Sequence, residues 1–132
     1  MALAFNRTLI VPVDTETINT TATFTSPEQD IGDDTIAEQI WMYVDVAGFA
    51  AAPAGNKLIT VKIAAVHTAS GTVYSDACAT YYFAVAADQA YAFSTPLLSL
   101  PRYFKVLVLN DTSQNTDADA VSVRIEYQAV TA

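Results

Sequence analysis

A chain of 132 residues is the size of a single domain, and no change in composition along it marks a boundary, so residues 1–132 are predicted to form one domain. Charged residues make up 15% of the chain, against a usual share of about 25%, which indicates a surface that is normally part-covered by a partner. The net charge is −8 and the six basic residues are scattered, which argues against binding nucleic acid or an anionic membrane. The other interpretation is a free protein solubilised by Thr, Ser, Asn and Gln.

The residues that carry chemistry are few. Cys78 is the only cysteine, which excludes an intramolecular disulfide and a zinc site built from several cysteines. A nucleophilic Cys78 would need His67, the only histidine, which is expected on a different strand; both are interpreted as structural residues. We therefore expect no catalytic residues, no cofactor and no metal. Paired carboxylates for glycoside cleavage stay open, because a sequence does not show their separation.

The first seven residues are interpreted as an N-terminal arm that becomes ordered on binding, with Leu3 and Phe5 ahead of the first expected strand, 8–13. No basic segment precedes the first apolar run, so no signal peptide is predicted and folding in a cytoplasm is expected. A Thr-rich strand is predicted at 18–25. The acidic loop that follows, 26–39, is interpreted as solvated; a calcium ion within 28–38 is the alternative.

Two strands with clear alternation are predicted next. The first, in EQIWMYVDVAG, points Ile40, Met42, Val44 and Val46 to the core and Trp41 and Tyr43 outward. The second, in KLITVKIAAVH, points Ile59, Val61, Ile63 and Ala65 inward and Thr60 and Lys62 outward. The loop between them contains two glycines and a proline, and Phe49 is expected to be exposed on it.

The rest of the chain predicts four more strands: ATYYFAVAA, AYAFSTPLLSL, LPRYFKVLVLND and VSVRIEYQAV. The last alternates strictly, with Val121, Val123, Ile125, Tyr127 and Ala129 on one face. With about eight strands and almost no helical periodicity, the sequence predicts an all-β fold, an antiparallel two-sheet sandwich that is jelly-roll-like.

The strand from Tyr103 to Leu109 is apolar on both faces except at Lys105. In a sandwich, one face of each strand is normally wet, so Tyr103, Leu107 and Leu109 need a second cover. The hypothesis is that a neighbouring protomer or the chain's own N-terminal segment supplies it. The alternative is an ordinary central strand covered by a loop of the same chain.

A carbohydrate-binding module is a second functional hypothesis. Such sandwiches present a row of coplanar aromatic rings on one sheet, and the sequence offers aromatic residues on several predicted strands. The rings proposed for the row are Trp41, Tyr43, Tyr81, Tyr82 and Tyr103.

The segments IWMYVDVAG, ITVKIAAVHTASGTVYSDA and LPRYFKVLVLNDT, followed by an alternating C-terminal strand, resemble small β-sandwich virion proteins of tailed bacteriophages, in particular capsid decoration or cement proteins. The likeness spans roughly residues 38 to 130 and depends on the order and spacing of the predicted strands and on the LPRY that leads into an apolar strand. Tail-associated and head-completion virion proteins are similar to the chain in the same way.

The resemblance implies a structural protein of the virion that binds the outer capsid surface and stabilises it, with the major capsid protein as its partner and a homodimer or homotrimer as its assembly. It implies no residue-specific binding signature. The expected interface residues come from the apolar positions noted above: Leu3, Phe5, Phe49, Tyr103, Leu107 and Leu109.

Overall fold

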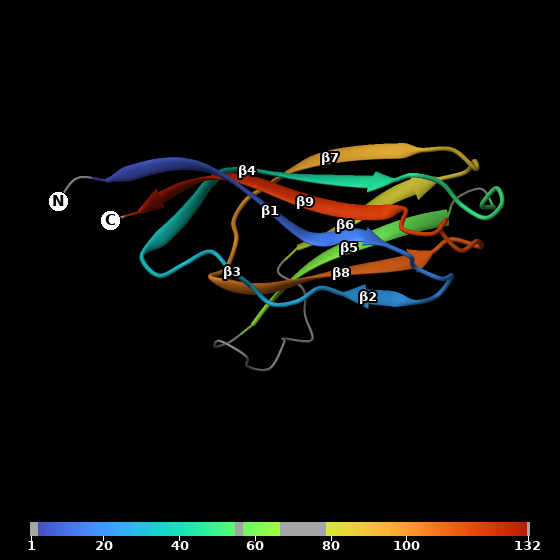
Figure 1. The fold of residues 1–132 in the computed structure, drawn as a ribbon, viewed down its shortest axis with the longest axis horizontal. Coiled ribbons are helices and arrows are strands. Elements are labelled where there is room, and N and C mark those ends of the chain that lie inside the picture. The colour runs from blue at the N-terminus through green and yellow to red at the C-terminus, as the bar shows by residue number, and fades with distance from the viewer. Residues whose placement is uncertain (1–2, 55–56, 67–78, 132) are drawn as a thin grey trace.

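The described residues of the computed structural model, 3–54, 57–66 and 79–131, form nine β-strands and no helix (Figure 1). His67 and Cys78 lie outside these residues. The strands are β1 (Ala4–Glu16), β2 (Thr23–Thr25), β3 (Gln29–Asp30), β4 (Thr35–Val46), β5 (Lys57–Ala65), β6 (Ala79–Val85), β7 (Tyr91–Leu97), β8 (Tyr103–Asp111) and β9 (Val121–Thr131).

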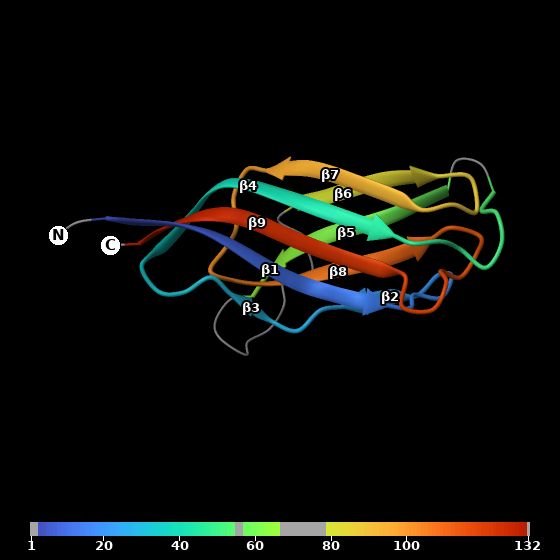
Figure 2. The ribbon, with the colours of Figure 1, turned by 45° about the horizontal axis from the view of Figure 1, so that its top comes forward.

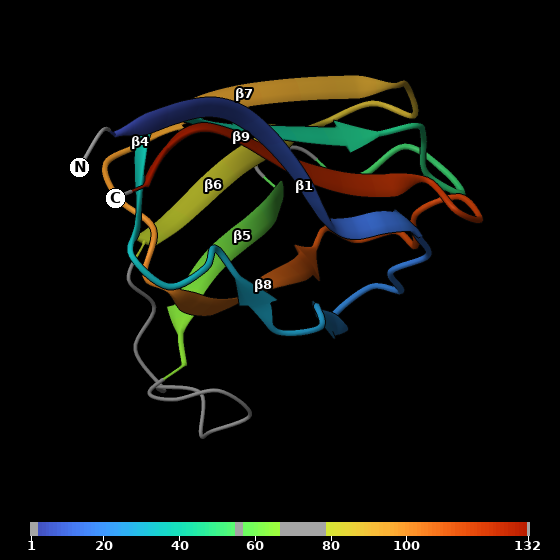
Figure 3. The same cartoon turned by 60° about the vertical axis from the view of Figure 1, so that its left-hand side comes forward.

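The strands form two antiparallel sheets that pack face to face (Figure 3). Sheet I has the order β1-β9-β4-β7, and sheet II has the order β2-β8-β5-β6, with β3 also pairing with β8. β2 and β3 both pair with β8, one after the other along its length. They therefore act as one interrupted strand, and each sheet has four strands. This order, with the chain crossing repeatedly between the sheets, is that of an eight-stranded jelly roll. The predicted fold class is confirmed.

The core lies between the two sheets and is filled by the residues that alternate inward along the strands. The inward residues predicted for the strands at 40–46, 59–63 and 121–129 are all buried. On β5, Ala65 is half-buried, and Thr60, which was predicted to point outward, is buried. Because β4 and β9 are neighbours in sheet I, Met42 pairs with Ile125 and Val44 with Val123, so the two inward rows lie side by side. On the opposite sheet, β8 contributes a matching row in Phe104, Val106 and Val108.

Phe49 is buried, with 1% of its surface exposed, so the prediction that it is exposed on a loop is wrong. The loop after β4 folds over the end of the sandwich, because its backbone pairs with the loop between β8 and β9: Ala50 N donates to the carbonyl of Asn115 at 2.9 Å. The Phe49 ring then meets Tyr91 edge to face, with 6.3 Å between the ring centroids. An apolar side chain therefore closes one end of the core.

The first strand begins at Ala4 rather than at residue 8. Residues 4–7 pair with 128–131 of β9, so in the structure this part of the expected arm belongs to sheet I. Hydrogen-bonded pairing with β9 makes residues 4–7 part of the strand, and the sequence pattern did not predict this pairing. The strand predicted at 18–25 is also shorter: only Thr23–Thr25 pair with β8, while Ile18 is buried in the crossing between the two sheets.

The outer face of β8 is half-buried at Leu107 and Leu109. Leu107 lies between Thr25 and Lys62 of the neighbouring strands, and Leu109 lies between Thr23 and Thr60. The chain's own N-terminal segment lies in sheet I, so the hypothesis that it covers this face is wrong. Flanking side chains within sheet II supply part of the cover, as expected for a central strand.

Candidate interaction surface

The outer face of sheet I carries an unusual number of exposed apolar side chains. Among the described residues, eight large hydrophobic side chains are exposed, and five of them lie on β1 and β4 of this sheet. A sixth, Leu3, immediately precedes β1 on the same alternation. We call this set the sheet I apolar face: Leu3, Phe5, Leu9, Val11, Ile36 and Trp41.

One row of this face shows how the side chains come together. Phe5 of β1 and Ile36 of β4 both lie opposite Val130 of β9, one on each side. Val130 points outward between them and is only 8% exposed, whereas Phe5 is 58% and Ile36 63% exposed. The three strands therefore build a continuous apolar ridge that faces away from the core. Contiguous apolar surface of this kind marks interaction sites in soluble proteins.

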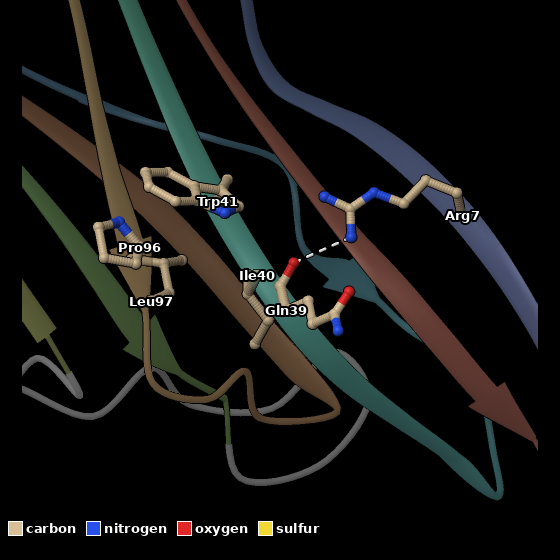
Figure 4. A pocket seen from close by; sticks show the side chains of 6 residues that line it. All are labelled: Arg7, Gln39, Ile40, Trp41, Pro96 and Leu97. Carbon is tan, nitrogen blue, oxygen red and sulfur yellow. Dashed lines mark hydrogen bonds between the residues drawn. The ribbon is translucent and has the colours of Figure 1, made fainter.

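A depression of about 410 Å³ adjoins this face beside Trp41 (Figure 4). It forms at a β-bulge, where Gln39 and Ile40 of β4 together oppose one residue of β9, Tyr127. Gln39 adopts a φ of 48°, the left-handed conformation that a bulge of this type requires. The residues that line the depression are Arg7, Gln39, Ile40, Trp41, Pro96 and Leu97.

Arg7 is held in place at the rim of the depression. Its Nη1 donates to the carbonyl oxygen of Gln39 at 2.9 Å, and its Nε donates to Oε1 of Glu126 at 2.6 Å. The carboxylate of Glu126 balances the charge of the guanidinium, so the depression offers an indole ring and an amide without a net charge. Such a surface suits a neutral ligand or an apolar side chain better than an anion.

The predicted row of aromatic rings does not form. Trp41 and Tyr43 share the outer face of sheet I, but Tyr82 and Tyr103 belong to sheet II, and Tyr81 points toward the core. Tyr43 is itself covered by the Arg124 guanidinium, which lies 5.3 Å from the ring centroid. Trp41 is therefore the one ring of the five that remains as a stacking platform on sheet I.

The expected interface residues separate into three places. Leu3 and Phe5 fall on the sheet I apolar face, while Phe49 lies in the core. Tyr103, Leu107 and Leu109 lie on sheet II, on the opposite side of the sandwich. Leu9, Val11 and Ile36 were not among the interface residues expected from the sequence. The alternation from Leu3 to Val11 carries a signal for the first two, whereas Ile36 was assigned to the acidic loop.

The acidic loop is bound by an arginine, Arg102, that immediately precedes β8. Arg102 donates from Nε to Asp30 at 3.3 Å and from Nη1 to Asp33 at 3.1 Å. Within residues 3–54, 57–66 and 79–131, no group of three or more His, Cys, Asp and Glu side chains could hold a metal ion. The same residues contain no helix long and apolar enough to cross a membrane.

Comparisons with protein-family models, curated proteins and solved structures find no match to this chain. The fold by itself does not select a function, because jelly rolls serve as viral coat proteins, lectins and cupins. The sheet I apolar face and the depression beside Trp41 are the surface features from which a function can be proposed.

Proposed function

We propose that this protein is a structural component of a phage particle, a decoration protein that binds the outer surface of the capsid through the sheet I apolar face. The observation that supports it is the contiguous ridge of Phe5, Val130 and Ile36. Leu9 and Trp41 are exposed further along the same face, beyond a polar row of Arg7, Gln128 and Glu38. Burying one large apolar side chain is worth roughly 1.5–3 kcal/mol. Several such residues on one face can offset the entropy lost on association.

The electrostatics of the face fit a protein partner. Two of its charges, Arg7 and Glu126, neutralise each other at 2.6 Å, so docking does not leave either of them unpaired. Glu38 is a further exposed charge on the same face, opposite Gln128 of β9. The four ion pairs found among the described residues are all partly exposed, and pairs of this kind contribute little to stability. We infer that apolar contact drives the association and that the negative surface elsewhere stays in water.

Stabilisation of a particle would follow from mass action. A protein that binds only the assembled capsid shifts the equilibrium away from expansion or disassembly. Because many copies act on one lattice, a modest affinity per copy is sufficient. No catalytic step is required.

The test is co-sedimentation of the purified protein with capsids that lack it. Wild type should bind to saturation and raise the melting temperature of the capsid. Ile36→Lys should weaken binding by at least about tenfold, because it places a charge in the apolar ridge. Tyr82→Lys is the matched control, since Tyr82 is 65% exposed but lies on sheet II. Equal binding by both variants would contradict the proposal.

The depression beside Trp41 supports a second candidate, binding of a neutral sugar. An indole ring that is 40% exposed, with an amide and an arginine nearby, provides stacking and hydrogen bonding. A pull-down on insoluble polysaccharides tests it, with Trp41→Ala expected to abolish binding. Polysaccharide binding in the absence of capsid binding would favour this candidate over the decoration protein.

A further inference from the structure

The edge of β1 is an open strand edge. In sheet I, β1 is the first strand, and within residues 3–54, 57–66 and 79–131 it pairs with β9 alone, so no described strand partners the backbone groups on its other side (Figure 2). β1 spans 13 residues, the longest strand of the described chain. A long edge of this kind is a template for pairing with another chain unless the sequence protects it.

The other edges are less suited to pairing. β7 carries Pro96, which lacks an N–H, and β2 and β3 have only three and two residues. β6 is uncharged, but the residues it points outward are Thr80, Tyr82 and Ala84, of which one is large and apolar. β1 combines an open edge with a row of large apolar side chains.

The protection of β1 is weak over its first half. Between Ala4 and Val11 the only charged residue is Arg7, whose charge is balanced by Glu126. The acidic residues of the strand, Asp14 and Glu16, come after Pro12. Pro12 and the bulge beside it mark where regular pairing of a further strand would stop. The segment available for pairing is therefore 4–12, and it is close to neutral.

We propose that a second copy of this chain pairs with β1 edge to edge, antiparallel, about a two-fold axis at Thr8. The two copies then share one continuous sheet of eight strands, with β1 against β1 at its centre. This goes beyond the proposed function, because it concerns the purified protein and needs no capsid. Edge pairing of this kind is an established mode of protein association.

The side chains determine the register. An axis at Thr8 places Phe5 opposite Val11 of the second copy and Arg7 opposite Leu9, and an aromatic residue beside a β-branched one is a favourable cross-strand pair. An axis at Arg7 would place two arginines directly opposite each other, which is destabilising. The segment 4–12 is also centred on residue 8, so this register uses all of it.

The arrangement has a consequence for the sheet I apolar face. Joining two copies through β1 places their outer faces side by side on one surface. Each dimer would then offer two copies of the ridge formed by Phe5, Val130 and Ile36. A bivalent surface binds a repeating lattice more tightly than either half alone, provided that both halves can engage together.

The first experiment measures the mass of the purified protein by gel filtration with light scattering at micromolar concentration. Wild type should be a dimer. Phe5→Lys should weaken association by at least about tenfold, because it adds a charge within the paired segment, opposite the apolar Val11 of the second copy. Ile36→Lys is the matched control: Ile36 flanks the same Val130 and is similarly exposed, at 63% against 58%, but it does not lie on β1.

A monomeric wild type, or equal loss of the dimer in both variants, would overturn the proposal. Circular dichroism of Phe5→Lys should match wild type, since Phe5 is exposed in the monomer. The result is separate from the capsid test. A monomer that still binds capsids would contradict the dimer but support the decoration protein. A dimer that does not bind capsids would support the dimer but contradict the decoration protein.

A cross-link tests the register directly. Only the residue on the two-fold axis lies opposite itself, so Thr8→Cys should form a disulfide-linked dimer under mild oxidation. Asn6→Cys, two residues away on the same face of β1, is the control and should not. Both variants retain Cys78, which therefore contributes equally. Cross-linking of both to the same extent, or of neither, would overturn the axis at Thr8.

Discussion

The side-chain amide of Asn110 donates a hydrogen bond of 2.8 Å to the carbonyl oxygen of Ile18, which lies 92 positions earlier in the chain. The same amide also donates to the carbonyl of Gln114 at 2.9 Å. Its Oδ1 accepts from the N–H and the hydroxyl of Thr112, at 3.0 and 2.6 Å. Asn110 is fully buried, so one polar side chain joins the crossing between β1 and β2 to the loop after β8.

We expect Asn110→Ala to lower the free energy of unfolding by about 2–4 kcal/mol, because it leaves several buried groups without partners. Urea denaturation followed by tryptophan fluorescence measures this. Asp111→Ala, at the next position but exposed, should change stability by less than about 0.5 kcal/mol. Similar losses in the two variants would mean that the Asn110 hydrogen bonds contribute little.

Phe49 and Phe5 provide a second test, because the sequence pattern treated both as interface residues. Phe49→Ala should cost about 3–5 kcal/mol, as expected when a large buried ring is removed from a core. Phe5→Ala should change the stability of the monomer by less than about 0.5 kcal/mol, since its ring is mostly exposed. Thermal unfolding at a concentration low enough to exclude association separates the two. A small effect at Phe49 would contradict its place in the core.

The contrast between these two residues shows what the sequence could and could not predict. Alternation placed the inward faces of β4, β5 and β9 correctly, because each face of a strand meets a single environment and the pattern records it. Phe49 lies in a loop with no alternation, so its burial depends on contacts with Asn115 and Thr116, far along the chain. Sheet order is likewise a property of long-range pairing that no local pattern contains.

The candidate surface was predicted only in part for the same reason. Leu3 and Phe5 were identified as exposed apolar residues, but their neighbours on the face, Ile36 and Trp41, come from β4. They meet only because β9 inserts between β1 and β4 in sheet I. A bulge at Gln39 then shapes the depression, and a bulge of this kind without glycine leaves little trace in a sequence.

Thr21 provides a test of backbone strain. Its φ is 63°, in the left-handed region where a β-branched residue is unfavourable, and its N–H donates to the carbonyl of Asn110 at 2.8 Å. Thr21→Gly should therefore stabilise the protein by up to about 1 kcal/mol, or roughly 3–5 °C in melting temperature.

Ala22→Gly is the control for this substitution. Ala22 is adjacent and exposed and is not among the residues with positive φ, so glycine there should lower stability by about 0.5–1 kcal/mol. Differential scanning calorimetry of both variants gives the sign of each change. Destabilisation by both to the same degree would show that Thr21 is not strained.

Tyr127 is expected to make the protein sensitive to alkaline pH. Burial raises the pKa of Tyr127 above its ordinary value of 10.0, and the negative charge of Asp30 raises it further. The folded state therefore holds the phenolic proton more tightly than the unfolded chain does. This contribution to stability is fully present below pH 10 and is lost as the pH rises through the raised pKa of the folded state.

Tyr127→Phe should accordingly flatten the fall in unfolding free energy above pH 10, measured by urea denaturation at a series of pH values. At pH 7 the phenol is neutral in the folded and the unfolded state. The difference in unfolding free energy between wild type and Tyr127→Phe at this pH therefore gives the effect of losing the hydroxyl group alone, and it is subtracted from the differences at higher pH. Parallel curves above pH 10 would show that Tyr127 ionises as readily in the folded protein as in the unfolded chain.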